Sequence, residues 1–96
     1  MTRDEILIFL HNNKAVIEHD FGVTKIGLCG SYARNEAGEN SDIDIVIEML
    51  PTGIFRNFMG LEQFLASNLN KRIDLGIKSS LKEYVIKRIE KDIIYV

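Results

Sequence analysis

The chain has 96 residues, of which 46% are hydrophobic and 27% are charged, and its formal net charge is −2. This length and balance predict one globular domain over residues 1–96 and exclude an intrinsically disordered chain. The slight acidic excess disfavours long nucleic acid as a partner, because a surface that grips phosphates normally carries a basic excess.

Three further absences bear on where the protein works. No apolar run approaches the roughly 20 residues that a membrane-spanning helix requires. The N-terminus, MTRDEILIFL, turns acidic almost at once and shows no secretory cleavage pattern. Cys29 is the only cysteine, so an intramolecular disulfide is impossible. We therefore expect a cytoplasmic protein without a membrane partner.

The first predicted element is a helix that ends near Gly22. Thr2 and Glu5 fit a capping box, in which two side chains bind free backbone N–H groups at a helix start. Asn12 and Asn13 weaken the middle of this helix. The apolar residues that recur at helical spacing are Ile6, Phe9, Leu10 and Ile17.

A strand is predicted next, over residues 23–29, and it ends at Gly30. The segment SYARNEAGEN predicts a short helical turn followed by a polar loop. In the segment SDIDIVIEML, Ile43, Ile45 and Ile47 alternate with other side chains at the period of a strand. The first half of the chain therefore predicts two strands joined by the turn and loop.

The second half predicts two more helices and two more strands. One helix has an apolar face formed by Phe58, Leu61, Leu65 and Leu69. A short strand follows over residues 72–77, and the next helix begins with Ser79 or Ser80 as its N-cap. The apolar face of that helix would be Leu81, Tyr84, Val85 and Ile89. With IIYV as a closing strand, the fold class is α/β (α+β), a mixed sheet of about four strands with helices packed on it.

Two features of the apolar residues have more than one interpretation. The group Phe55, Phe58, Met59 and Phe64 builds either the core or a surface for a protein partner. Cys29 lies in an apolar strand, which favours a small core residue over a nucleophile.

Two carboxylates are placed at the start of the second predicted strand. Asp42 and Asp44 should project from the same face, about 6–7 Å apart along the chain, because successive side chains of a strand point to opposite faces. Ile43 and Ile45 should point the other way, into the core. Adjacent anions repel unless a cation lies between them, and Mg²⁺ prefers one or two carboxylates together with phosphate oxygens and water.

Asp74 has a similar setting in the third predicted strand. If that strand lies beside the second, about 4.8 Å away, Asp74 joins Asp42 and Asp44. Three carboxylates can hold two Mg²⁺ ions about 3.5–4 Å apart, the arrangement used for in-line nucleotidyl transfer. The residues alone leave open a second interpretation, in which these aspartates are solvated strand residues, although aspartate is depleted in strands.

Gly30 and Ser31 form the turn after the first strand. Glycine lets the backbone approach a ligand closely, and a serine at a helix start offers its hydroxyl and nearby N–H groups to phosphate. Arg34, one turn on, could add charge-assisted hydrogen bonds. The segment lacks the G-K-[ST] ending of a Walker loop. On Gly-Ser alone, an ordinary strand-to-helix turn with Ser31 as N-cap is the favoured interpretation.

The combination of GSYAR at 30–34 with SDIDI at 41–45 resembles the signature of the DNA polymerase beta-type nucleotidyltransferase superfamily. It looks specifically like the minimal nucleotidyltransferase (MNT) group. The resemblance covers nearly the whole chain, including RIDLG with Asp74 and the closing IIYV. One departure is Asn35, where the group often has glycine. Asparagine also tolerates left-handed backbone angles, so the turn should survive.

The resemblance implies a role for each matched residue. Asp42 and Asp44 would bind the metal ions, and Asp74 would be a third ligand and the base for the acceptor hydroxyl. The residues assigned to nucleotide binding are Gly30, Ser31, Arg34 and Ser41. Of these, the Gly-Ser pair would hold the β- and γ-phosphates of ATP with help from the arginine, and Ser41 would cap the turn into the strand.

Members of the MNT group commonly pair with a small helical HEPN-domain protein, a ribonuclease toxin encoded beside them. The resemblance therefore implies an antitoxin that transfers AMP from ATP to a tyrosine hydroxyl of a HEPN toxin, with Mg²⁺ as cofactor. Two alternatives stay open: a non-catalytic antitoxin that neutralises its toxin by binding, and a small-molecule (antibiotic) nucleotidyltransferase. The complete set of three aspartates favours catalysis, and small-molecule enzymes usually carry an additional substrate-binding domain.

Overall fold

The computed structural model describes residues 1–96, and its elements follow the order predicted from the sequence. The helices are α1 (Arg3–Asn12), α2 (Lys14–Phe21), α3 (Gly30–Ala33), α4 (Ile54–Leu69), the 3₁₀ turn η1 (Lys78–Ser80) and α5 (Glu83–Ile89). The strands are β1 (Val23–Cys29), β2 (Ile43–Met49), β3 (Ile73–Ile77) and β4 (Ile94–Tyr95). None of these helices is both long enough and apolar enough to span a bilayer.

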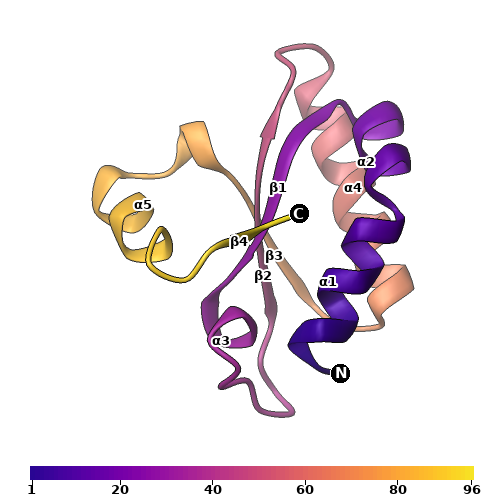
Figure 1. The fold of residues 1–96 in the computed structure, drawn as a ribbon. Helices are drawn as coiled ribbons and strands as arrows, with labels where there is room; N and C mark the ends of the chain where they lie inside the picture. The colour runs from indigo at the N-terminus through magenta and orange to yellow at the C-terminus, as the bar shows by residue number, and fades with distance from the viewer.

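The strands form one mixed sheet in the order β3-β2-β1-β4, which confirms the predicted fold class. β1 pairs antiparallel with β2 and β4, whereas β2 and β3 are parallel. Two parallel neighbours need a crossover connection, which α4 supplies. Helices α1, α2 and α4 cover one face of the sheet, and α5 lies on the opposite side (Figure 1). The two faces of the sheet therefore have different neighbours.

The core lies between the sheet and helices α1, α2 and α4. Ile43, Ile45 and Ile47 of β2 are at most 1% exposed, which confirms the predicted alternation. The apolar face of α4 contributes three buried leucines, Leu61, Leu65 and Leu69. Because neighbouring residues of a strand face opposite ways, burying the isoleucines turns Asp44 toward the other face of the sheet.

The first predicted helix is two helices, although its capping box is confirmed. The Thr2 hydroxyl accepts a hydrogen bond from the Glu5 N–H at 3.2 Å, and the Glu5 carboxylate accepts one from the Thr2 N–H at 2.8 Å. The chain breaks at Asn13, whose side-chain amide donates to the Phe9 carbonyl at 2.9 Å. An asparagine that binds the backbone in this way competes with the helical hydrogen bonds. Gly22, at φ 65°, ends α2 as expected.

The prediction that Ser79 or Ser80 caps the last helix was wrong. Both serines belong to η1, and the chain is extended at Lys82, which is the N-cap of α5. No residue of α5 is buried, so this short helix does not pack into the core. The apolar residues at 85 and 89, which suggested a core-facing helix, line a cleft instead.

Candidate active site

A cleft of about 490 Å³ lies between α5 and the open face of the sheet. Side chains of β1, α3, β2, β3 and α5 line it. Of the residues predicted for the site, the structure brings together Gly30, Ser31, Arg34, Asp44 and Asp74 in this cleft. Ser41 and Asp42 lie outside it, in a neighbouring hollow.

Asp44 and Asp74 are register partners in the parallel pair β2–β3. Their backbones lie one strand spacing apart, about 4.8 Å. The pKa of Asp44 is raised to about 6, chiefly by burial, and also by the charge of Asp74, a hydrogen bond with Asp74 and the charge of Asp42. The nearby charge of Arg34 opposes this shift. The cleft therefore holds two crowded carboxyl groups, and a bound cation would relieve their repulsion.

Gly30 is required by the close approach of Asp44. The residue has φ 73°, in the left-handed region that glycine adopts without strain. A Cβ built at this position would overlap the Asp44 carboxylate, with the Cγ atom only 2.9 Å away. The residue after β1 and the start of β2 thus meet with no room for a side chain at position 30, and Gly30 lines the cleft.

Asp42 is held by a different partner. It directly precedes β2, and its Oδ1 accepts a hydrogen bond and ion pair from Arg72 Nε at 3.0 Å. Arg72 directly precedes β3, so the parallel pairing brings the two side chains together. The sequence led us to expect that Asp42 and Asp44 share one environment. In the structure they do not, because Asp42 pairs with Arg72 and Asp44 faces the cleft. The Asp42 charge still raises the pKa of Asp44, so Asp42 lies near the cleft but is turned to Arg72.

The two serines occupy different places. Ser31 is the second residue of α3, and it is Cys29 that precedes the helix as N-cap. The Ser31 hydroxyl makes no hydrogen bond within the chain, so it remains available to a ligand in the cleft. The Ser41 hydroxyl accepts a hydrogen bond from the Gly38 N–H at 2.9 Å. Ser41 therefore closes the loop before β2, and the structure does not bring it to the cleft.

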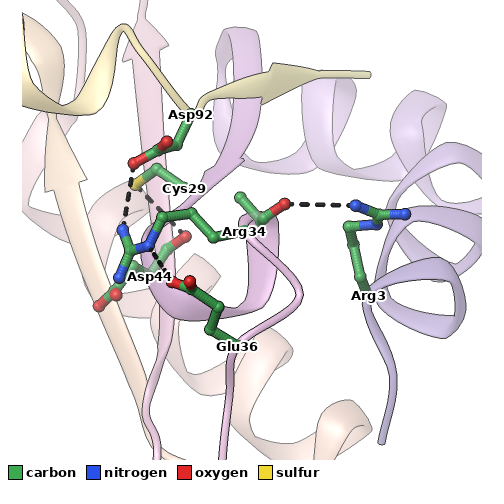
Figure 2. Close-up of polar contacts among 7 residues, drawn as sticks. Arg3, Cys29, Arg34, Glu36, Asp44 and Asp92 are labelled. Atoms are coloured by element: carbon green, nitrogen blue, oxygen red, sulfur yellow. Dashed lines mark hydrogen bonds and ion pairs between the residues drawn. The ribbon is translucent and has the colours of Figure 1, made fainter.

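Arg34 is already engaged by two carboxylates (Figure 2). Its Nε donates to Glu36 at 2.8 Å and its Nη1 donates to Asp92 at 3.1 Å. These hydrogen bonds raise the pKa of Arg34. The following residue, Asn35, has φ 62°, which confirms that asparagine supports the turn where the family often has glycine. The contacts fix the orientation of the Arg34 guanidinium at the rim of the cleft.

Sequence reasoning missed two residues of the cleft. Asp92 lines it and binds Arg34 from the segment before β4. Arg88 of α5 also lines it, and it makes no hydrogen bond or ion pair within the chain. Both lie in or just after the last predicted helix, to which the sequence analysis assigned no functional residue. No local motif in KRIEKD marks them, because their place depends on how α5 crosses the sheet.

Cys29 is a core residue, as the sequence predicts. It is 3% exposed, and its Sγ donates to the Asp44 carbonyl at 3.5 Å (Figure 2). Burial and the charges of Asp44 and Asp74 raise the pKa of the thiol to about 12. A thiol in this state is a poor nucleophile, so the chemistry of the cleft belongs to its carboxylates.

The donor atoms of the cleft suit a hard divalent cation. The structure has no group of three or more His, Cys, Asp or Glu side chains arranged to hold a metal ion. Asp44 and Asp74 nevertheless offer adjacent carboxylate oxygens, which are the ligands that Mg²⁺ prefers alongside substrate phosphates. Asp42 would complete the predicted set only by leaving Arg72. The residues present therefore fit a magnesium site built on two carboxylates.

Comparison with known proteins shows which family of enzymes this chain resembles. The sequence profile of a nucleotidyltransferase domain family matches residues 12–96. A Thermococcus cleftensis protein named protein adenylyltransferase MntA is 38% identical over 96 residues, an alignment that covers 100% of this chain and 97% of that protein.

Solved structures share the fold. One, provisionally described as a minimal nucleotidyltransferase, superposes with a TM-score of 0.84 over 98% of this chain and 95% of its own, at 20% identity. A chain from a crystal structure of a toxin–antitoxin with AMP-PNP superposes with a TM-score of 0.72 at 27% identity. That match covers 88% of this chain and 69% of the other.

Proposed function

The chain belongs to the nucleotidyltransferase domain family and is a nucleotidyltransferase enzyme. From this premise we propose that it transfers AMP from ATP to a tyrosine hydroxyl of a HEPN-domain toxin, and so acts as an antitoxin. The relative named protein adenylyltransferase MntA supports a protein as the acceptor. The likeness to a toxin–antitoxin structure with AMP-PNP supports ATP as the donor and a toxin as the partner.

One observation carries the proposal: Asp44 and Asp74 are register partners on β2 and β3, beside Gly30, the residue that follows β1. Asp44 and Asp74 would hold Mg²⁺, and Asp42 would become a further ligand if it left Arg72. Bound Mg²⁺ would offset negative charge on the triphosphate and on the leaving pyrophosphate. The chain itself supplies the phosphate site and the proton acceptor.

The phosphate site lies at the end of β1. Gly30 and Ser31 line the cleft there, and the Ser31 hydroxyl would donate to a phosphate oxygen. Arg88 adds a positive charge from the opposite wall of the cleft. These groups would hold the β- and γ-phosphates, so that the α-phosphorus lies nearer to Asp44 and Asp74.

The transfer is then an in-line displacement at the α-phosphorus. The tyrosine oxygen forms a bond to phosphorus, the bond from phosphorus to the β-phosphate oxygen breaks, and pyrophosphate leaves. Asp74 is exposed on the edge strand and takes the phenolic proton. The products are the AMP-tyrosine ester and pyrophosphate, which balance the reactants.

The test uses the purified chain, Mg²⁺, ATP labelled at the α-phosphate and a HEPN-domain protein, which the proposal expects in the neighbouring reading frame. We expect the label to appear on a tyrosine of the HEPN protein, with release of pyrophosphate. The double substitution Asp42→Asn/Asp44→Asn should abolish labelling. If the wild type gives no label and the double variant still neutralises the toxin fully, the chain acts by binding alone and the catalytic proposal fails.

A further inference from the structure

An apolar groove lies next to the cleft, at the outer edge of β3. We name it the α4–β3 groove, and it has a volume of about 500 Å³. Its apolar wall comprises Ile54, Phe55, Phe58, Gly76, Ile77 and Leu81. No charged residue lines it, and Ser80 offers the only side-chain hydroxyl. The groove is therefore suited to an apolar occupant.

The rim of the α4–β3 groove exposes large apolar residues to solvent. The side chain of Phe55 is 81% exposed, and Ile54 beside it is 43% exposed. A large aromatic side chain beside a concave apolar surface is typical of the anchor points of protein interfaces. The sequence left open whether this phenylalanine builds core or a partner surface, and its exposure excludes the core.

The groove and the cleft share a boundary, where Leu81 packs against Gly76. Gly76 and Leu81 line both of them. Gly76 follows Asp74 by two residues on β3, so the two residues share one face of the strand. An acceptor segment next to Asp74 therefore reaches the groove by passing over Leu81.

The strand order places the groove on the acceptor side of the cleft. Gly30 and the phosphate site lie at the end of β1, whereas the groove lies beyond β3, with β2 between them. In an in-line displacement the attacking group approaches from the side opposite the leaving group. Pyrophosphate that leaves toward Gly30 thus requires an acceptor that approaches from Asp74, next to the groove.

We propose that the α4–β3 groove binds a large apolar side chain of the acceptor protein, on the segment that carries the modified hydroxyl. The inference rests on the proposed transfer to a protein. The adenine base is the competing occupant, but its polar edge would find one hydroxyl and no charged group there. An aliphatic or aromatic side chain loses no hydrogen bond on entering the groove, and it contacts Phe55.

The experiment measures AMP transfer from labelled ATP to the HEPN-domain protein, with KM determined separately for each substrate. Phe55→Ala should raise KM for the HEPN protein by about tenfold or more, the loss typical of an aromatic anchor, and leave KM for ATP unchanged. Phe55→Leu should restore much of the affinity. The matched control is Met59→Ala, because Met59 is an exposed apolar residue of α4 that lies outside the groove.

Each outcome decides for or against the groove. An active Phe55→Ala enzyme with unchanged KM for the HEPN protein overturns the proposal, and a raised KM for ATP overturns it in favour of adenine. If the wild type transfers no AMP, the proposed function fails, and calorimetric titration with the HEPN protein then tests the groove alone. Weaker binding by Phe55→Ala supports the groove, whereas equal binding, or no binding by the wild type, overturns it.

Discussion

At the scale of single residues, Gly30 and Asp44 depend on each other. A methyl group at position 30 would overlap the Asp44 carboxylate, and φ at this position is 73°. We expect Gly30→Ala to lower the free energy of unfolding by about 1–3 kcal/mol and to abolish transfer, because Asp44 must move aside. Denaturant unfolding and labelled-ATP transfer measure the two effects.

The control for this substitution is Gly38→Ala. A Cβ at Gly38 meets no atom within 4 Å, so the loop accommodates it. Equal losses of stability in the two variants would show that the contact between Gly30 and Asp44 is not the cause.

Asp44 also makes stability depend on pH when metal is removed. Its pKa is about 6 in the folded protein against an ordinary 3.8. The folded state holds this proton more tightly, so the contribution of Asp44 to stability is complete below pH 3.8 and is lost as the pH rises through about 6. With a chelator present, Asp44→Asn should be more stable than the wild type at neutral pH.

Thermal unfolding of the wild type and of Asp44→Asn over this pH range tests the prediction. The stability advantage of the variant should shrink as the pH falls toward 4, because the wild-type carboxyl group is then neutral as well. An advantage that does not change with pH would mean that the charge of Asp44 is not its source.

At the scale of elements, α5 forms a wall of the cleft and not part of the core. Its position makes Arg88 the cation of the cleft that has no acidic partner, whereas Arg34 is bound by Glu36 and Asp92. We expect Arg88→Ala to raise KM for ATP by about tenfold, within the range of a charge-assisted hydrogen bond to phosphate. Steady-state kinetics at saturating acceptor measure this change.

The matched control is Lys91→Ala, which removes an equal charge from an exposed position just after α5 and outside the cleft. If both variants raise KM for ATP equally, the effect is long-range charge and not contact by Arg88.

The sequence predicted most elements, but not what α5 packs against. Its apolar positions at 85 and 89 have helical spacing, and that pattern is the same for a helix on a core and a helix over a cleft. The N-cap was misassigned because the serines at 79 and 80 are good capping residues, whereas the chain uses them in η1 and begins α5 after Lys82. Tertiary packing, and not local preference, decides both outcomes.

At the scale of the whole molecule, the two faces of the sheet have different roles: one packs into the core that stabilises the fold, and the other forms the cleft. One face carries the buried isoleucines and the leucines of α4, and the other carries the cleft. Leu65 is fully buried, so Leu65→Ala should lower the free energy of unfolding by about 2–5 kcal/mol. Asp74 is exposed, so Asp74→Ala should abolish transfer without lowering the unfolding temperature.

Circular dichroism with thermal unfolding, together with labelled-ATP transfer, compares the two variants. Unchanged turnover by Asp74→Ala would remove Asp74 from the active site. A large drop in its unfolding temperature would show that the two faces are not independent.

The sequence left the pairing of β2 with β3 as a condition, which the structure meets, and it did not predict the partner of Asp42. The triplets Ile43–Asp44–Ile45 and Ile73–Asp74–Leu75 have the same pattern, and the parallel register aligns them residue by residue. Arg72 competes for Asp42 because both directly precede paired strands. Whether Asp42 pairs with Arg72 or faces the cleft depends on the orientation of its side chain, and residue spacing in the sequence does not predict that orientation.

The crossover through α4 has a consequence for biosynthesis. A nascent chain that has emerged as far as Met49 already contains the glycine turn and two of the three aspartates, but Asp74 belongs to the strand that comes after the crossover helix. The ribosome must therefore deliver about three quarters of the chain before the carboxylate pair can form. Any premature termination before β3 leaves a product that lacks half of that pair.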